Sequence, residues 1–139
     1  MTTLIENADS NEPILQTFEE GDFLASFWGY DQTNVNFFKV IKKTATSVTL
    51  QDWEQEIVKG KDAGYLAEYV KLGYGPKVGH DGQGNYGVHK PFRRKLKVAK
   101  DMAWRGGKEI QYEYVKIKSW GMYATKCDPN GEYLQTHYH

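Results

Sequence analysis

Short segments rich in aromatic and β-branched residues, separated by polar turn residues, run along the first half of the chain. Residues 23–30 and 35–41 are dominated by hydrophobic side chains, and residues 47–53 alternate between apolar and polar positions. Segments of this length and pattern are typical of β-strands, and the Gly, Asp, Asn and Thr residues between them are typical of tight turns. We therefore expect three strands joined as a meander.

The strand pattern returns in the second half, where it is combined with positive charge. Alternation over residues 92–98 assigns side chains to two opposite sides of a strand. One side carries Phe92, Arg94, Leu96 and Val98, and the other carries Arg93, Lys95 and Lys97. Further strands are predicted over residues 110–118, 120–125 and 133–138. In the first of these, two sets of side chains compete for the inner face: Ile110, Tyr112 and Tyr114, or Val115 and Ile117.

The last two predicted strands are joined by the clearest local signal in the chain, Asp128-Pro-Asn-Gly131. Proline, asparagine and glycine in this order suit a type I turn whose glycine adopts a left-handed conformation. Such a turn predicts a bulged hairpin between the two strands.

Three segments depart from the strand pattern. Residues 1–17 lack a sustained period and are predicted to be a flexible arm or a loosely docked tail. Residues 62–72 place apolar side chains near one face behind Asp62 as a cap, which predicts a short helix. Residues 73–87 contain six glycines, which predicts a long mobile loop because glycine-rich backbone is costly to order. The remaining pattern, roughly seven short strands with at most this one helix, predicts a single β-rich domain over residues 18–139, a small bent sheet or SH3-like β-barrel.

Length and cysteine content limit the class of protein. A chain of 139 residues fits one domain with its own core. Cys127 is the only cysteine and cannot form an internal disulfide, and no stretch resembles a secretory signal or is long enough to span a membrane. We therefore expect a cytoplasmic protein without a membrane partner.

Charge is balanced overall but divided along the chain. Residues 1–60 contain four Lys and ten Asp or Glu, a net −6, whereas residues 61–139 contain fourteen Lys or Arg and eight Asp or Glu, a net +6. Residues 89–108 hold eight of these cations and one acid. A total charge of zero argues against a strong nonspecific nucleic-acid binder, but the uneven distribution permits a local basic face.

Residues 28–34, Trp-Gly-Tyr-Asp-Gln-Thr-Asn, combine large rings with turn residues. The simpler interpretation is a hairpin turn in which the tryptophan is buried and Asp31 and Asn34 bond to their own backbone. Gln32 has no usual role in a turn, however, and Tyr30 belongs to a residue type enriched at the energetic centres of interfaces. The expected contact surface consists of Tyr30, Gln32 and Asn34, shared with Arg93 or Arg105.

The basic strand also has two interpretations. It is either a solvated strand with one charged face, which is the usual explanation, or a stripe that binds phosphates through Arg93, Lys95 and Lys97 with Arg105 nearby. Basic side chains beside an aromatic β-surface are the general design of proteins that bind single-stranded nucleic acid.

The sequence predicts neither a metal site nor a catalytic centre. Cys127 and His137 would face each other across the final hairpin, but a structural zinc ion needs four ligands. The glycine pattern of residues 82–87 lacks the βαβ frame of a dinucleotide-binding motif, and no G-x-S-x-G, H-E-x-x-H or Walker A pattern is present. We therefore expect a non-catalytic protein without a cofactor.

Gly21-Asp22, residues 28–34 and Phe37-Phe38-Lys-Val40 together resemble small proteins carried by bacteriophages and mobile elements, a family without an assigned activity. Those proteins share a Trp-Gly-Tyr-[Asp/Glu]-Gln-Thr-Asn segment soon after a Gly-Asp turn. Their basic strand and their Tyr- and Trp-rich end are similar to residues 92–95, 119–123 and 136–138 here. The glycine-rich residues 73–87 depart from the family pattern. The resemblance implies a phage or plasmid context and names no catalytic residue.

Two functions from different classes follow. The resemblance favours an inhibitor of a host defence factor, an anti-CRISPR-type or other anti-defence protein that acts by occlusion. The alternative is a nucleic-acid-binding accessory protein that uses residues 90–108 and exposed aromatic side chains. The expected partners are therefore a host protein or nucleoprotein complex, single-stranded nucleic acid, or a second copy of the chain as a homodimer, in the cytoplasm of a host bacterium.

Overall fold

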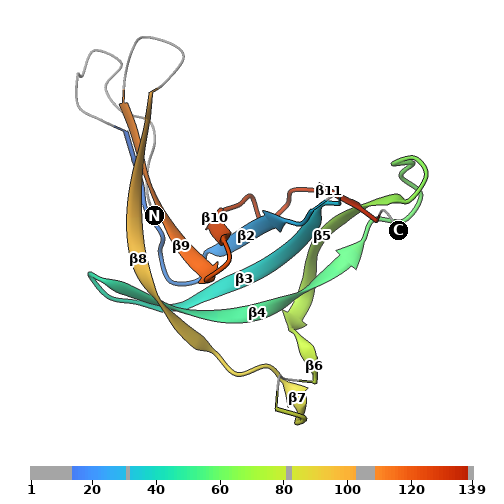
Figure 1. Cartoon of the computed structure of the whole chain (residues 1–139), viewed down its shortest axis with the longest axis horizontal. Coiled ribbons are helices and arrows are strands. Elements are labelled where there is room, and N and C mark those ends of the chain that lie inside the picture. The colour runs from blue at the N-terminus through green and yellow to red at the C-terminus, as the bar shows by residue number, and fades with distance from the viewer. Residues whose placement is uncertain (1–13, 31, 81–82, 103–108, 138–139) are drawn as a thin grey trace.

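The computed structural model describes residues 14–30, 32–80, 83–102 and 109–137, and the regular elements in these residues are all β-strands (Figure 1). The prediction of a mostly β fold is therefore confirmed. The strands are β1 (Ile14–Gln16), β2 (Phe23–Trp28), β3 (Asn34–Lys43), β4 (Ser47–Ile57), β5 (Ala67–Pro76), β6 (Val78–His80), β7 (Tyr86–Val88), β8 (Phe92–Met102), β9 (Glu109–Lys118), β10 (Met122–Lys126) and β11 (Tyr133–Thr136).

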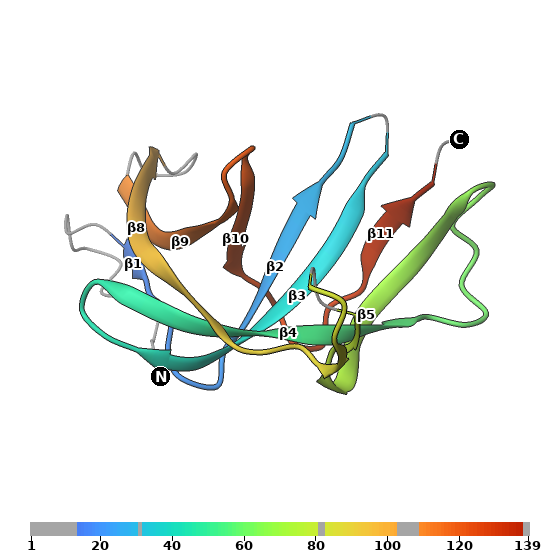
Figure 2. The same cartoon turned by 60° about the horizontal axis from the view of Figure 1, so that its bottom comes forward.

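Six strands close into a barrel. The order is β9-β10-β2-β3-β4-β8, every neighbouring pair is antiparallel, and β8 returns to pair with β9. Figure 2 shows these strands curving round, with β4 crossing beneath the others. Closure leaves these strands without a long free edge, which removes a template for edge-to-edge association.

The long strand β4 belongs to two parts of the molecule. Its residues 47–50 pair with β8 in the barrel, whereas residues 53–57 pair with β5, which in turn pairs with β11. The end of β11 reaches the β2–β3 turn, where the Thr136 amide donates to the Thr33 carbonyl at 3.0 Å. The strands β5 and β11 therefore form a second layer beside β2, β3 and β4.

The barrel wall separates two hydrophobic cores, because successive side chains of a strand point to opposite faces. On β3, Phe38 lies in the barrel core and Phe37 lies in the core beneath β5 and β11. The barrel core contains Phe18, Leu24, Phe38, Val40, Val48, Leu50, Val115, Ile117, Met122 and Ala124. The second core contains Ala25, Val35, Phe37 and Val70, with Trp53, Leu72, Cys127 and Tyr133 packed against it.

The inner face of β9 is formed by Glu113, Val115 and Ile117, so the second of the two competing sets is the correct one. Glu113 is buried and accepts hydrogen bonds from the Phe18 amide at 2.6 Å and from the Lys43 ammonium at 2.8 Å. These bonds hold the segment after β1 against the barrel, and β1 itself pairs in parallel with β9. Of the two interpretations of this segment, a flexible arm does not hold for residues 14–17, which are docked on the barrel, and residues 1–13 lie outside the described residues.

The predicted helix over residues 62–72 is wrong, because β5 occupies most of that segment. Asp62 accepts a hydrogen bond from the Gly64 amide at 2.9 Å in a local turn, and Leu66 has a left-handed φ of 58° that excludes a helix there. Tyr69 and Val70 then pair with β11, and Val70 is fully buried. Strand pairing and burial outweigh the weak helical period of the sequence.

The glycine-rich residues 73–87 contain the end of β5 and the β6–β7 hairpin, so the prediction of a long loop is wrong for these strands. Gly73 allows β5 to approach β4 closely, since a Cβ at this position would lie 2.9 Å from the Glu54 Cβ. The β6–β7 hairpin projects from the barrel (yellow, bottom of Figure 1), and residues 81–82 lie outside the described residues. The mobility of this segment stays a prediction.

The Asp128-Pro-Asn-Gly131 turn is present but does not form the predicted hairpin. The Gly131 amide donates to the Asp128 carbonyl at 3.0 Å, and the Asn130 amide donates to the Asp128 carboxylate at 2.9 Å. However, β10 pairs with β2 and β9, whereas β11 pairs with β5, and Gly131 lacks a left-handed φ. The turn therefore carries the chain from the barrel to the second layer.

Candidate nucleic-acid interface

The outer face of β8, β9 and β10 is the part of the barrel wall that faces away from the second layer. On β8 the cations predicted to share one side are exposed, whereas Phe92, Arg94 and Leu96 are half-buried, which confirms the predicted sidedness of this strand. Val98 follows the same alternation but is 55% exposed, because it lies beyond the part of β8 that pairs with β4.

Three tyrosines form a row on this outer face. Val115, Ile117, Met122 and Ala124 point into the barrel core, so the alternate residues Tyr112, Tyr114 and Tyr123 point outward. The ring centroids of Tyr112 and Tyr114 lie 6.2 Å apart, and those of Tyr114 and Tyr123 lie 5.8 Å apart.

Cations border the tyrosine row. Lys97 is the cross-strand partner of Tyr114, and the Lys116 ammonium lies 5.9 Å from the centroid of the Tyr123 ring. With the described carboxylates, none of Arg93, Lys95 and Lys97 forms an ion pair. We name this surface the tyrosine–lysine face, made by Arg93, Lys95, Lys97, Tyr112, Tyr114, Lys116 and Tyr123.

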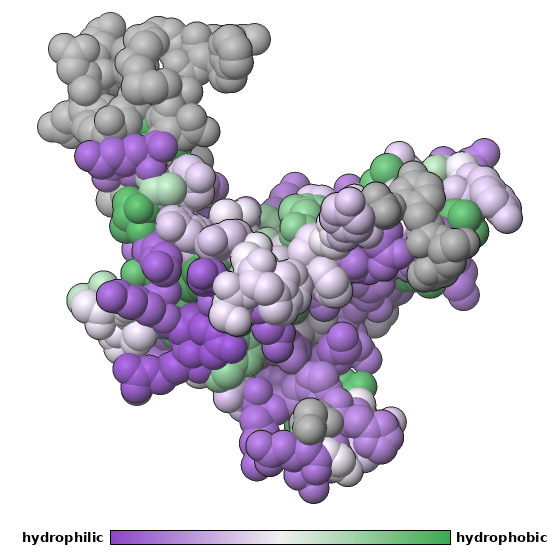
Figure 3. Space-filling model, viewed as in Figure 1, coloured by the Kyte–Doolittle hydropathy of each residue, from purple (hydrophilic) through white to green (hydrophobic). Residues whose placement is uncertain are grey.

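The charge of this face is of one sign. The described carboxylate at its centre, Glu113, points into the barrel and is neutralised there by Lys43. Figure 3 shows strongly hydrophilic surface along the middle and lower part of β8. The face therefore offers cations and aromatic rings together, without a carboxylate between them on β8 from Arg93 to Lys97.

A second feature, which we name the barrel-mouth groove, opens at one end of the barrel. Its cavity of about 450 Å³ is lined by the rings of Trp28, Phe92 and Trp120 and by the cations Lys77, Arg94 and Lys118. The Trp28 and Trp120 centroids lie 5.2 Å apart, and the Arg94 guanidinium lies 4.6 Å from the Phe92 centroid. Trp28, expected to be buried, is half-buried here and packs against the barrel core.

The β2–β3 turn uses most of its polar side chains internally. The Gln32 amide donates to the Asn34 side-chain oxygen at 3.3 Å, and the Asn34 amide donates to the Trp28 carbonyl at 3.3 Å. The inference that Gln32 has no role in the turn is therefore wrong. Tyr30 is 91% exposed, so it remains the turn residue available for contact, while Asp31 lies outside the described residues.

The structure separates the two halves of the predicted contact surface. Arg93 is the partner of Thr49, and Thr49 is the partner of Lys42. Lys42 lies eight residues beyond Asn34 on β3, so roughly 26 Å of extended strand separates the turn from Arg93. Lys95 lies further along in the same direction, opposite Ser47. Arg105 lies outside the described residues.

The turn instead adjoins the barrel-mouth groove. Phe27, Trp28, Tyr30 and Trp120 line one hollow that continues from it. Arg94 and Trp120, which the sequence interpretation did not single out, connect this region to the basic strand. The available signal was an arginine among the apolar residues of β8, since a charged residue on an inner side needs a partner or a function.

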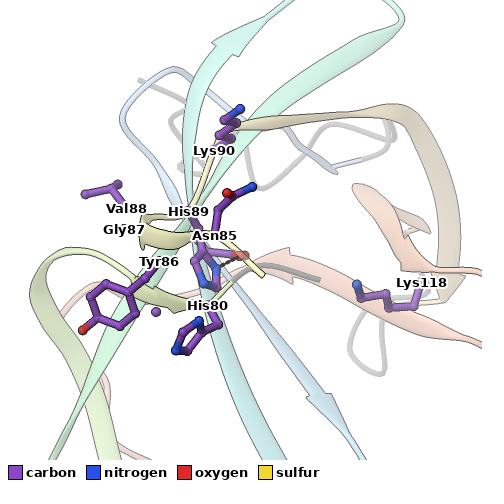
Figure 4. Close-up of a pocket in the computed structure, with 10 residues that line it drawn as sticks. His80, Asn85, Tyr86, Gly87, Val88, His89, Lys90 and Lys118 are labelled. Carbon is purple, nitrogen blue, oxygen red and sulfur yellow. Dashed lines mark hydrogen bonds and ion pairs between the residues drawn. The ribbon is translucent and has the colours of Figure 1, made fainter. Parts of the chain in front are cut away.

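A histidine pocket lies next to the groove (Figure 4). The His89 Nδ1 lies 2.9 Å from an Asp52 carboxylate oxygen, and the Gln51 amide donates to the His89 carbonyl at 2.6 Å. In Figure 4 the Lys118 side chain extends toward the His80 and His89 side of the pocket, whereas the Tyr86 ring points away. These bonds fix the base of the β6–β7 hairpin to β4.

His89 and Cys127 belong to residue types that nucleophilic sites use. An Asp-oriented histidine is one half of a nucleophilic centre, and the described residues that line this pocket include no serine, threonine or cysteine. Burial raises the pKa of the Cys127 thiol to about 11, so this thiol is protonated at neutral pH and weakly nucleophilic. Among the described residues, no three His, Cys, Asp or Glu side chains converge as a metal site would require.

We found no protein-family model, no curated protein and no solved structure that matches this chain. The part of the chain that the structure describes contains no helix long and apolar enough to cross a membrane.

Proposed function

We propose that this protein binds single-stranded nucleic acid on the tyrosine–lysine face. The observation that carries the proposal is the row of Tyr112, Tyr114 and Tyr123 beside the exposed cations of β8, which form no ion pair with a described carboxylate. Stacking of a base on an aromatic ring contributes about 1–3 kcal/mol and tolerates any base sequence. Cations beside the rings bind the phosphates of the same strand.

A single strand fits this face better than a duplex does. Bases are available for stacking on tyrosine rings only where they are not stacked inside a helix. The charge distribution agrees with a local interaction, since the acidic first half of the chain would repel a nucleic acid wrapped around the whole molecule. The neutral total charge then limits nonspecific attraction at a distance.

The test is the salt dependence of binding to a fluorescein-labelled single-stranded oligonucleotide, followed by anisotropy. The double substitution Lys95→Gln with Lys97→Gln should weaken binding and flatten the slope of log K against log salt by about 1.4, or 0.7 for each lost phosphate contact. The matched control is Lys59→Gln with Lys71→Gln, which removes the same charge from the β4–β5 side and should leave the slope unchanged. Equal slopes for the two double variants would contradict the proposal.

Tyr114 separates stacking from charge. Tyr114→Ala should weaken oligonucleotide binding by roughly 5- to 150-fold, which corresponds to about 1–3 kcal/mol per stacked base. Tyr114→Phe keeps the ring and should bind like the unmodified chain. If the phenylalanine variant binds as weakly as the alanine variant, the ring does not stack on a base.

The second candidate is a protein-binding inhibitor of a host defence factor in a phage context. The observation that favours it is Tyr30, whose side chain is 91% exposed on the β2–β3 turn although tyrosine is enriched at interface centres. This candidate predicts negligible oligonucleotide binding and the nuclease-resistant recovery of one host protein from a lysate. Tyr30→Ala should abolish that recovery without lowering the melting temperature of the domain.

A further inference from the structure

We infer that the barrel-mouth groove is a separate binding site for a nucleoside monophosphate, with the base on Trp120 and the phosphate at Arg94 and Lys118. The inference rests on the contacts of the groove and not on those of the tyrosine–lysine face. Either site can therefore be wrong while the other is right.

The tryptophan pair provides a stacking surface that is already in place. The Trp28 indole N–H donates to the Asn36 side-chain oxygen, which fixes the orientation of this ring. Trp120 packs against it with an interplanar angle of 60° and is still 62% exposed. A large ring that is held on one side and open on the other is suited to stack on a planar ligand.

Arg94 is held so that part of its guanidinium remains available. Its Nε donates to the Ile117 carbonyl at 3.1 Å, its Nη1 donates to the Arg93 carbonyl at 2.8 Å, and its plane lies over the Phe92 ring. Arginine has five N–H groups, so three remain for a ligand. A guanidinium fixed in this way is preorganised for the planar, bidentate recognition of a phosphate.

The balance of charge in the groove favours an anion. Lys77 and Lys118 line it, and neither forms an ion pair with a described carboxylate. Asp52, the one carboxylate among the described lining residues, is already bonded to His89 at 2.9 Å. An anionic ligand would therefore meet three cations without displacing an existing ion pair.

The combination of groups selects the class of ligand. The volume of about 450 Å³ lies within the range of small-molecule sites, about 300–1,000 Å³. An apolar ligand would leave the cations unused, and inorganic phosphate would leave the exposed Trp120 ring unused. A nucleoside monophosphate uses both, whether it is free or forms the phosphorylated end of a strand.

The experiment is calorimetric titration of the full chain with AMP, CMP, GMP and UMP, compared with adenosine and with inorganic phosphate. At least one monophosphate should bind in saturable fashion, at least tenfold more tightly than adenosine and phosphate alone. Arg94→Lys keeps the positive charge but removes the paired N–H donors of the guanidinium, so it should weaken that binding at least tenfold. Lys118→Gln, an exposed substitution that preserves the fold, should weaken it as well, and Tyr65→Ala, an exposed residue that does not line the groove, should not.

Two results would overturn the inference. One is that none of the four monophosphates binds better than inorganic phosphate, and the other is that Lys118→Gln and Trp120→Ala both bind AMP like the unmodified chain. Competition of AMP by a 5′-phosphorylated oligonucleotide, but not by its unphosphorylated form, identifies a strand end as the source of the ligand. Absence of that competition, with AMP still bound, identifies a free nucleotide. If the protein binds oligonucleotides but no monophosphate, the inference about the groove is wrong and the proposed function of the tyrosine–lysine face still stands.

Discussion

Gly29 determines the shape of the β2–β3 turn. Its φ is +133°, and a Cβ there would lie 2.3 Å from the Gln32 carbonyl oxygen. Gln32 and Asn34 then bond to each other and to the backbone of the turn. The unusual run of polar residues after Trp28 is thus largely explained by the turn, and Tyr30 is the residue that the turn does not require.

Replacing Gly29 by alanine should therefore destabilise the domain. The new methyl group both collides with backbone and occupies a strained conformation, so the free energy of unfolding should fall by about 1–3 kcal/mol. Gly75→Ala is the control, since nothing lies within 4 Å of a Cβ at that position. Urea denaturation of both variants tests this, and equal midpoints would show that the turn can relax.

Glu68 makes the stability of the second layer depend on pH. Hydrogen bonds from His137 and then from Gln135, at 2.9 and 2.8 Å, lower the pKa of this carboxyl group. Because the folded-state pKa lies below the unfolded value, the stabilisation is present above the ordinary glutamate pKa and is lost as pH falls through the lowered value. Glu68→Gln should therefore show a smaller loss of stability between about pH 5 and pH 3 than the unmodified chain. Urea midpoints that fall in parallel over this range would contradict this role.

At the scale of the elements, the sequence predicts strands better than it predicts their partners. The sides of β8 follow from alternation alone, because the pleat fixes which residues share a face. The Asp128-Pro-Asn-Gly131 turn forms as expected, but turn chemistry is local and does not determine that β10 and β11 belong to different layers. The helix predicted over residues 62–72 is replaced by β5 because the pairing of that strand is set by β4 and β11, which the local sequence does not reveal.

Glu113 illustrates a link between elements that alternation could not reveal. Its carboxylate joins the segment after β1, the end of β3 and β9 through two hydrogen bonds. Glu113→Ala leaves the Phe18 amide buried without its acceptor, so the free energy of unfolding should fall by about 2–3 kcal/mol. Glu132→Ala removes the exposed partner of Lys61 and should cost much less. Equal losses in urea denaturation would show that the buried bond is no stronger than the surface one.

At the scale of the whole molecule, one barrel wall divides the surface into a covered and an open half. The outer face of β2, β3 and β4 packs under β5 and β11, whereas the outer face of β8, β9 and β10 carries the tyrosine–lysine face. The sequence predicted the cations of β8 and the general design of the site. It could not predict which tyrosines lie beside these cations, because that depends on the register of the β8–β9 and β9–β10 pairs and on which residues of β9 face the core.

The central claim is that single-stranded nucleic acid lies on the tyrosine–lysine face. The most direct measurement is ultraviolet cross-linking of a 5-iodouracil-substituted single-stranded oligonucleotide, with the attached residues identified by mass spectrometry. Tyrosines elsewhere are internal controls, since Tyr30, Tyr65 and Tyr74 are each 91% exposed and thus more accessible than Tyr112 and Tyr114. We expect cross-links at Tyr114 and Tyr123 that are lost when salt is raised. Cross-links confined to Tyr65 and Tyr74, or none at any tyrosine, would contradict the account.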